Sequence, residues 1–357
     1  MKTYLILLSL LLCVTSVLSQ RAHSCTAFYI SKGGQKIVGR NFDWHFDHGL
    51  VMANKRHVAK TALVMPNEIP AQWTSKYGNV TFNQYGREFP VGGMNEKGLM
   101  VEVLWLDSAI LPEQSGKPAL NEVQWVQYQL DNFATVKEVI THLPDLRIAK
   151  VLANLHYFVC DRTDQCVTIE PIDGKMFIHT EKDLPVSCLA NNPYDESLAY
   201  ATPYLSLTNS SAWPTSPTSL NRFTCAACMA NNLSSDQIRT NAVNETYNIL
   251  QAVSQGDFTK WSVVYDMANS KIYFKTQPIK TIKIIDLNAL NFDCAQAVKI
   301  IDINTAQPGD ITAKMTDYTI EANRRNVELG LVNQGLGNLP QELIELMIKY
   351  PDSTKCQ

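Results

Sequence analysis

The sequence has no long hydrophobic run after Val17, and neither sign of charge dominates it. Lys and Arg number 31 against 34 Asp and Glu, so the formal net charge is −3. Such a chain offers no strong field to a polyanion, and we expect no nucleic-acid partner. Nine cysteines in 357 residues are too few for a small disulfide scaffold. Internal repeats and low-complexity tracts are also absent, and 45% hydrophobic residues indicate a folded globular protein.

The first residues have the pattern of a signal peptide. A positive charge precedes the apolar stretch from Leu5 to Val17, which is too short to span a bilayer comfortably. Small residues allow cleavage before Gln20 or before Cys25. We therefore expect residues 1–24 to be a signal peptide with any short pro-segment. Residues 25–357 would then form one domain.

Cleavage there implies export, to a secreted, periplasmic or lysosome-like location according to the host, without stable membrane insertion. An oxidising compartment favours disulfides. Cys160 and Cys166 flank a polar turn and are candidates for a cross-strand disulfide, whereas the other pairings stay open. In a eukaryotic secretory pathway, four Asn-x-Ser/Thr sequons would carry surface glycans, at Asn79, Asn209, Asn232 and Asn244.

Hydrophobic periodicity and turn residues predict a mixed fold. Strands are predicted at 25–30, 36–40, 99–106, 155–160, 166–170, 261–266, 271–275 and 280–287. Helices are predicted at 121–143 with a break near Asn132, where Thr135 to Glu138 form a capping box, and at 221–232, 243–254 and 340–350. Because strands and helices come in blocks rather than in strict alternation, we predict a single α+β domain.

The interpretation of function depends on Cys25, which directly follows the second cleavage site. It could be a structural thiol, or a lipidated cysteine, for which Ala22 is a poor match. The third interpretation is an N-terminal nucleophile. An N-terminal cysteine carries an α-amine of pKa about 7.7–8.0, which can accept the proton of a thiol whose ordinary pKa is about 8.5. Such a site needs no histidine.

A charged pair follows on the strand that should pair with Cys25. Arg40 can stabilise a thiolate because it does not lose its charge, and Asp43 can orient an amine. Three residues apart on an ideal strand, the two side chains point to opposite faces, so we expect a bend near Asn41 or Asp43. A surface ion pair is the alternative interpretation.

Five ordered motifs then resemble the choloylglycine hydrolase family, which contains bile salt hydrolases and penicillin V acylases. They are Cys25-Thr, Gly39 to Trp44, Gly93 to Leu99, Leu189 to Pro193 and Asn221 to Phe223. The resemblance runs from Cys25 to about Lys275. It implies the four-layer αββα sandwich of N-terminal nucleophile hydrolases, with residues 25–357 as a single catalytic domain.

The resemblance also implies roles for individual residues. Cys25 matches the nucleophile, whose own amine is the base. Arg40 matches the arginine beside the thiol, and Asp43 matches the carboxylate that hydrogen-bonds the α-amine. Asn191 matches the side-chain donor of the oxyanion hole. Arg222 matches a second arginine near the nucleophile.

One position departs from the bile salt hydrolases. Trp105 stands where they carry an Asn, and penicillin V acylases tend to have an aromatic residue there. The second oxyanion donor of the family is a backbone N–H at this place, which Trp105 can supply. With Trp44, its indole predicts a pocket for a flat or hydrophobic acyl group. Plain core packing of both indoles is the alternative.

Other motifs are interpreted as structural. The C-x-x-C of Cys225 and Cys228 lies within a predicted helix, which argues against redox function. His45 and His48 match no zinc signature, so we expect no metal site, and no cofactor is required. Two further histidines in apolar stretches should be hydrogen-bonded core residues, His142 and His156.

The sequence therefore predicts an exported hydrolase that cleaves a linear amide of a small N-acyl substrate through a Cys25 thioester. Penicillin V, an N-acyl homoserine lactone and a conjugated bile salt are the candidate substrates. An N-acylethanolamine or ceramide-type amidase is a more remote variant. A secreted binding protein on a catalytically dead scaffold is the alternative from another class. The sequence leaves a homo-oligomer open.

Overall fold

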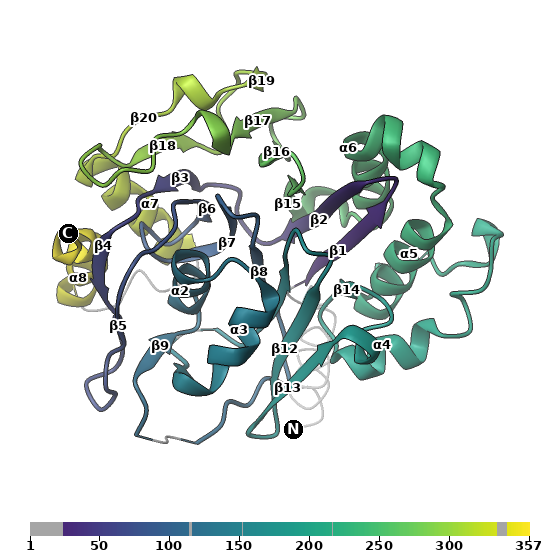
Figure 1. Ribbon diagram of the computed structural model, residues 1–357, viewed down its shortest axis with the longest axis horizontal. Helices are drawn as coiled ribbons and strands as arrows, with labels where there is room; N and C mark the ends of the chain where they lie inside the picture. The colour runs from purple at the N-terminus through teal and green to yellow at the C-terminus, as the bar shows by residue number, and fades with distance from the viewer. Residues whose placement is uncertain (1–23, 114–115, 152, 216, 334–340) are drawn as a thin grey trace, which may run out of the picture.

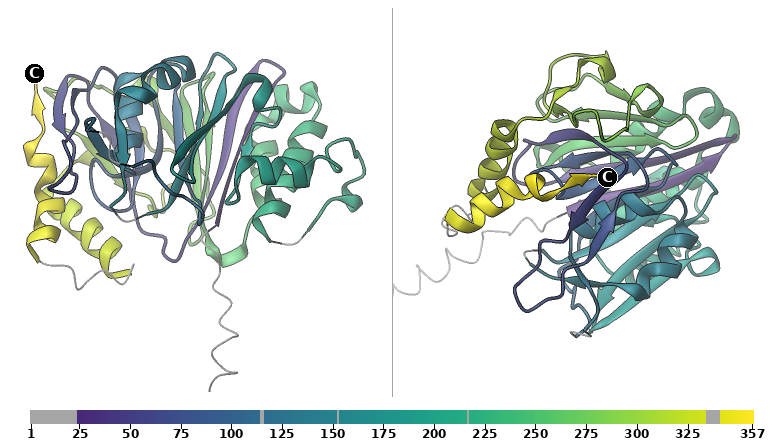
Figure 2. Two further views of the ribbon diagram at one scale, coloured as in Figure 1. Left: turned by 90° about the horizontal axis from the view of Figure 1, so that it is seen from below. Right: turned by 60° about the vertical axis from the view of Figure 1, so that its left-hand side comes forward.

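The computed structural model describes residues 24–357 except 114–115, 152, 216 and 334–340. The predicted signal peptide, Ser24 apart, lies outside the described residues. Two large sheets pack face to face in the described part of the chain, and helices cover their outer faces (Figures 1 and 2).

Sheet A carries the start of the described chain. Among the described residues it has seven strands, in the order β14 (Cys188–Leu189), β1 (Ser24–Lys32), β2 (Gln35–Asp43), β15 (Thr259–Asp266), β16 (Lys271–Thr276), β17 (Lys283–Asp286) and β19 (Gly309–Asp310). The predicted hairpin of β1 and β2 is confirmed. Its strands pair without a register shift from Ser24 opposite Asp43 to Lys32 opposite Gln35.

Sheet B lies against the inner face of sheet A. Its nine strands, counted over the described residues, run in the order β13 (Lys175–Thr180), β12 (Cys166–Ile172), β11 (Leu155–Cys160), β8 (Met100–Trp105), β7 (Pro90–Asn95), β6 (Asn79–Asn83), β3 (Leu50–Asn54), β18 (Lys299–Asp302) and β20 (Thr316–Asp317). Phe82 of β6 and Phe274 of β16 meet edge to face between the sheets, with ring centroids 5.6 Å apart.

Small strand groups complete the sheet structure. They are β9 (Ala119–Asn121) with β10 (Arg147–Ala149), and β21 (Lys355–Cys356) with β4 (Val58–Thr61) and β5 (Gln72–Thr74). The helices are α2 (Gln124–Asn132), α3 (Val136–His142), α4 (Tyr194–Ala201), α5 (Ser219–Asn232), α6 (Ser235–Ala252), α7 (Ile320–Asn333) and α8 (Gln341–Lys349). In the described part of the chain, no helix combines the length and apolar character that a membrane span needs.

The helices complete a four-layer αββα arrangement. Helices α5 and α6 pack on β1 and β2, where the Asn41 side chain donates to the Leu250 carbonyl over 2.7 Å. Helix α2 packs on β7 and β8 of sheet B, where the Asn95 side chain donates to the Leu130 carbonyl over 2.9 Å. Figure 1 shows α4, α5 and α6 on one side and α2 and α3 on the other.

Local sequence signals decided where several elements begin and end. The predicted break near Asn132 separates α2 from α3, and Thr135 forms the expected capping box with Glu138. Helices α4 and α7 and the first half of α6 were not predicted. The segment 235–242 is mostly polar and has one buried apolar side chain, Ile238, so it shows no helical period.

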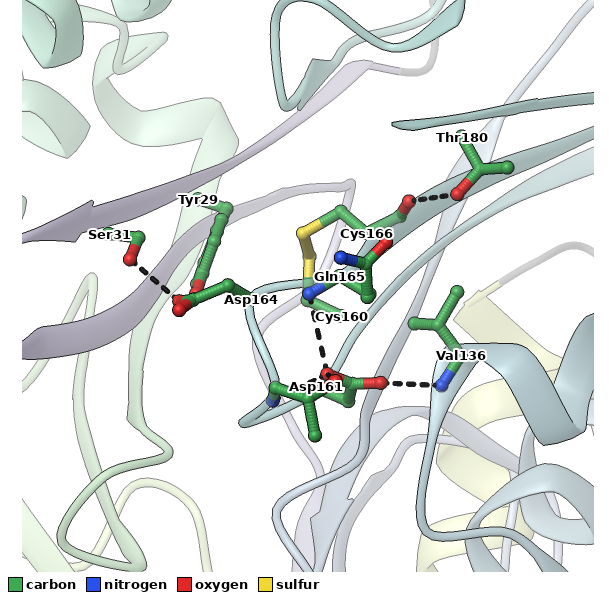
Figure 3. The surroundings of a disulfide bond; sticks show 10 residues. Tyr29, Ser31, Val136, Cys160, Asp161, Asp164, Gln165, Cys166 and Thr180 are labelled. Atoms are coloured by element: carbon green, nitrogen blue, oxygen red, sulfur yellow. Dashed lines mark hydrogen bonds between the residues drawn. A yellow bond between two sulfur atoms is a disulfide. The ribbon is translucent and has the colours of Figure 1, made fainter. Parts of the chain in front are cut away.

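The predicted disulfide between Cys160 and Cys166 is present (Figure 3). It joins β11 to β12 across their turn. Two aspartates of this turn accept hydrogen bonds from neighbouring elements. Asp161 accepts from the Val136 N–H at the start of α3 over 2.7 Å, and Asp164 accepts from the Tyr29 hydroxyl of β1, also over 2.7 Å. A second disulfide, Cys294–Cys356, ties the C-terminal strand β21 to the segment that precedes β18.

Two surface and core expectations are corrected. Asn79, predicted as a surface glycan site, is fully buried in β6, where its side chain donates to Asp131 over 2.9 Å. Because β6 lies inside sheet B with both faces covered, this sequon is inaccessible in the folded chain. The other three sequon asparagines are exposed. His142, predicted as a core residue, is exposed and pairs with Asp145.

Candidate active site

Cys25 stands near the start of β1 and is 4% exposed. Its Sγ lies 3.8 Å from Nη2 of Arg40, which is itself 1% exposed. Cys25 is directly opposite Phe42 of β2, so Cys25, Phe42 and Arg40 share one face of sheet A. That face is turned towards sheet B, because another hydrogen of Nη2 reaches the Val103 carbonyl over 3.1 Å.

The bend expected in β2 is absent, because β1 and β2 keep their register through Asp43. Instead, the irregularity lies in the neighbouring strand, where β15 shifts register between Thr259 and Trp261. Asp43 therefore points to the helix-covered face of sheet A, away from Arg40. It approaches the sulfur through its backbone, since the Asp43 N–H hydrogen-bonds to Cys25 Sγ.

The Asp43 carboxyl is fully buried and closely held. Oδ1 accepts from the Thr259 hydroxyl over 2.5 Å, and Oδ2 accepts from the Gln255 amide over 2.9 Å. Nη1 of Arg222 lies 3.8 Å from Oδ2. Position Thr259 can reach Asp43 because the register shift of β15 occurs directly beside it.

Asn191 and Arg222 join the site from the segment after β14 and from α5. The Cys25 N–H donates to Asn191 Oδ1 over 2.7 Å, and Asn191 Nδ2 donates to the Trp105 carbonyl over 2.8 Å. Arg222 donates to the Cys25 carbonyl over 2.6 Å and to Asn191 Oδ1 over 2.8 Å. In this structure Cys25 follows Ser24, so its nitrogen is a peptide nitrogen with a single hydrogen.

A buried pair supports the turn that carries Asn191. His156 Nε2 lies 2.8 Å from the Ala190 carbonyl and therefore donates to it, since a carbonyl only accepts. His156 Nδ1 lies 2.9 Å from Glu170, whose carboxyl also accepts from the Tyr194 N–H over 3.1 Å. The pair thus holds both flanks of Asn191, and the expectation of a hydrogen-bonded core histidine is confirmed for His156.

Burial and charge act in opposite directions on the buried titratable groups. Burial raises the pKa of the Cys25 thiol, against the lowering effect of the Arg40 charge. Burial likewise raises the pKa of the Asp43 carboxyl, opposed chiefly by Arg222. Burial lowers the pKa of the Arg222 guanidinium, which the charge of Asp43 opposes. Burial thus favours the neutral thiol of Cys25, whereas the charge of Arg40 favours the thiolate.

Two indoles lie beside the site. The rings of Trp44 and Trp105 are inclined by 43° with centroids 6.0 Å apart. Trp44 is 8% exposed, whereas Trp105 is partly exposed at the end of β8 and donates from its indole to Asp107 over 2.5 Å. His45 and His48, considered as metal ligands, are not part of any group of three metal-ligating side chains in the described residues.

A family model for linear amide C–N hydrolases of the choloylglycine hydrolase family matches residues 25–300, with its first residue at Cys25. The chain belongs to the choloylglycine hydrolase family. It is accordingly a hydrolase of linear amide C–N bonds, and the resemblance carried by the five motifs is confirmed. Helices α7 and α8 lie beyond the residues that the family model matches.

Relatives and solved structures agree with this membership. The penicillin V acylase of Pectobacterium atrosepticum is 28% identical over 262 residues, which cover 62% of this chain and 69% of that protein. The solved penicillin V acylase of Agrobacterium tumefaciens is 27% identical with a TM-score of 0.74 and covers 83% of this chain and 98% of that one.

A solved variant of the conjugated bile acid hydrolase of Clostridium perfringens shares the fold. It is 19% identical with a TM-score of 0.65, covering 78% of this chain and 97% of that one. Together with the penicillin V acylase structure, it confirms the expected four-layer sandwich of N-terminal nucleophile hydrolases.

The structure brings together all five residues to which the choloylglycine hydrolase motifs pointed, and adds three partners that were not predicted. These are Glu102, Gln255 and Thr259. A signal existed for Glu102, because it is a charged residue in a strand predicted to be buried on both faces. Gln255 and Thr259 had none, since they reach Asp43 across more than 200 residues.

Proposed function

We propose that this protein is an exported N-acyl amide hydrolase of the penicillin V acylase type, with Cys25 as its nucleophile once the preceding residues are removed. One observation carries the proposal: the buried Cys25 Sγ lies 3.8 Å from the Arg40 guanidinium near the start of a strand. Similarity to two penicillin V acylases, at 28% and 27% identity, supports that substrate class.

Cleavage before Cys25 turns its peptide nitrogen into an α-amine, which in neutral form accepts the thiol proton. The thiolate attacks the amide carbonyl carbon, and the carbonyl electron pair moves to oxygen. When the C–N bond breaks, the α-ammonium returns the proton to the leaving nitrogen. A free amine departs and an acyl thioester remains on Cys25. We propose that the α-ammonium donates hydrogen bonds to the Asp43 carboxyl through its additional hydrogens and keeps the existing hydrogen bond to Asn191 Oδ1.

We propose Asn191 and Trp105 as the oxyanion donors. The Asn191 amide nitrogen has two N–H bonds, of which one goes to the Trp105 carbonyl. The strand register supports the backbone N–H of Trp105 as the second donor. The Leu106 N–H donates to the Asn154 carbonyl, so the next pair along β8, Trp105 opposite Leu155, is a non-hydrogen-bonded pair. Its N–H and C=O therefore both point away from β11. One such donor is typically worth about 2.7–4 kcal/mol of barrier.

Hydrolysis of the thioester completes the cycle. The α-amine takes a proton from water, whose oxygen attacks the thioester carbonyl, and the C–S bond breaks with return of the electron pair to sulfur. A carboxylic acid leaves and the thiol is regenerated. The acyl group would lie against the inclined indoles of Trp44 and Trp105, whose apolar faces suit an aryl or other flat group.

The test combines mass analysis with an activity assay. The full chain is expressed through a secretory pathway, and the intact mass of the purified protein should correspond to a chain that begins at Cys25. Hydrolysis of penicillin V is then compared for the unaltered protein, Cys25→Ala and Cys25→Ser. Both variants should lose turnover, because a hydroxyl is a much poorer nucleophile near neutral pH. Cys225→Ala, which removes another free thiol, serves as the control.

Three outcomes would overturn parts of the proposal. Undiminished hydrolysis by Cys25→Ala would reject the nucleophile, and active protein that still carries Ser24 would reject the α-amine as the base. A panel containing a glycine-conjugated bile salt, a long-chain N-acyl homoserine lactone and an N-acylethanolamine tests the acyl group. Preference for the steroidal amide over penicillin V would reject the substrate class.

A further inference from the structure

A carboxyl is buried directly behind the arginine of the site. Glu102 lies in β8 of sheet B, and its Oε2 is 2.8 Å from Nε of Arg40 in β2 of sheet A. Their side chains are 2% and 1% exposed. The guanidinium is thus attached to β8 twice, by Glu102 at Nε and by the Val103 carbonyl at Nη2. The same Nη2 is the atom that faces Cys25 Sγ.

The surroundings of Glu102 are built for a carboxyl group. Its Oε1 accepts a hydrogen bond from the hydroxyl of Tyr265, a fully buried residue of β15. Below it, Gly92 of β7 leaves the necessary space, because a Cβ there would lie 2.2 Å from Oε2. Any larger residue at this position would displace the carboxyl group from Arg40.

Glu102 and the Cys25 thiol are linked electrostatically through Arg40. The charged and titratable groups that face Glu102 are Arg40 and Tyr265. Those that face the thiol are Arg40, Asp43 and Arg222. Burial raises the pKa of Glu102 to about 7, against the lowering effect of Arg40, so both of its protonation states are accessible near neutral pH. Ionised Glu102 offsets the charge of Arg40, and neutral Glu102 leaves that charge to act on the sulfur.

We propose that Glu102 is a positioning residue that holds the Arg40 guanidinium towards Cys25 Sγ and limits how much of its positive charge stabilises the thiolate. The inference rests on the proposed function only in taking Cys25 as the nucleophile. Glu102 touches neither the substrate nor the sulfur and acts through Arg40. It therefore has two separable effects, one on geometry and one on charge.

Two conservative variants separate these effects. Glu102→Gln keeps the length and an acceptor oxygen but removes the charge, so the pKa of the Cys25 thiol should fall by on the order of one unit. Glu102→Asp keeps the charge but shortens the reach, so kcat should fall while KM and the pH profile stay near their original values. Tyr265→Phe removes the hydrogen bond that favours ionised Glu102 and should shift the profile in the same direction as Glu102→Gln, by less.

The experiment measures alkylation of Cys25 by iodoacetamide against pH in the processed protein, with peptide mapping to separate it from Cys188, Cys225 and Cys228. Glu102→Gln should move the midpoint to lower pH and raise the alkylation rate at pH 8.5, where Glu102 of the unaltered protein is ionised, by up to about tenfold, with little change at pH 6. The acid limb of kcat/KM for penicillin V should move with it. An unchanged midpoint, or one moved to higher pH, would overturn the inference, because a merely structural carboxyl would alter stability without moving this profile.

Failure of the inference and failure of the proposed function give different results. If Cys25→Ala hydrolyses penicillin V as fast as the unaltered protein, the proposed function fails whatever Glu102 does. If Cys25→Ala is inactive and Glu102→Gln shows the original alkylation profile, the nucleophile stands and the role of Glu102 is rejected. The alkylation measurement needs no substrate, so it decides the role of Glu102 independently of substrate choice.

Discussion

The backbone and the side chain of Asp43 have different partners around Cys25, the proposed nucleophile. Its backbone N–H hydrogen-bonds to Cys25 Sγ, while its carboxyl lies among Thr259, Gln255 and Arg222 on the other face of the sheet. The sequence predicted that Arg40 and Asp43 would point to opposite faces of the strand. A bend was therefore expected to bring both side chains to the Cys25 thiol. No bend is needed. The Cys25 sulfur lies on the face of sheet A that carries Arg40, whereas the Cys25 backbone lies in the plane of the sheet and can be approached from the face that carries the Asp43 carboxyl.

The role proposed for Asp43 can be tested by a substitution that keeps its shape. Asp43→Asn should lower kcat on the order of 10²-fold, since the amide cannot stabilise the α-ammonium that returns the proton to the leaving group. KM should change little. The measurement is steady-state hydrolysis of penicillin V, with Asp47→Asn as a control in the following loop. A rise in KM at constant kcat would contradict this role.

Asn79 shows that a glycosylation sequon can be inaccessible when its strand is buried. The sequon is intact, but its asparagine bonds inside sheet B to Asp131, which also pairs with buried Lys60 over 2.9 Å. A motif of three residues contains no information about burial, which depends on the neighbouring strands. The same holds for His142 and His156, which looked alike in the sequence and differ completely in exposure.

At the scale of elements, strands with a continuous apolar run and helices with strong caps were predicted best. Strand β8 and the break between α2 and α3 lie where they were expected. Helix α6 begins earlier than predicted because its first turn is determined by the capping box of Ser234 and Gln237, not by an apolar face. Caps are local, so they could have been recognised there too.

The capping box of α3 makes a prediction about stability. Thr135 accepts from the Glu138 N–H, and Glu138 bonds back to the Thr135 N–H. Thr135→Ala should lower the free energy of unfolding by about 1 kcal/mol, because a helix N–H loses its acceptor. Urea unfolding measures the loss. Thr141→Ala, at an exposed position of the same helix, is the control and should stay within about 0.5 kcal/mol of the unaltered protein.

At the scale of the whole molecule, the site exists only where the two sheets meet. Arg40 comes from sheet A, and its anchors Glu102 and Val103 come from sheet B. The packing of the sheets therefore positions the guanidinium at the sulfur. This arrangement buries the Glu102 carboxyl between two sheets, which makes the folding stability of the protein dependent on pH.

That dependence has a definite sign. Burial raises the pKa of Glu102 from 4.5 to about 7, so the folded state holds its proton more tightly than the unfolded chain. Its stabilising contribution is complete below pH 4.5 and is lost as the pH rises through 7. Relative to Glu102→Gln, the unaltered protein should lose about 3 kcal/mol of unfolding free energy over this interval. Urea titrations of both proteins at several pH values measure it, and a constant difference would contradict the burial of an ionisable group.

The sequence by itself determined the hairpin that presents Cys25 and the caps of α3, and it offered Cys160 and Cys166 as candidates for a disulfide. These depend on short-range spacing, in which the period of a strand or the reach of a turn links neighbouring residues. The order of five motifs along the chain indicated the hydrolase family. Only the tertiary structure decided that Asn191 and Arg222, 166 and 197 positions after Cys25, close on its backbone, and that Glu102 lies behind Arg40. Those contacts arise from packing two sheets and a helix layer, and no local pattern encodes the distance between elements that meet only after the chain has folded.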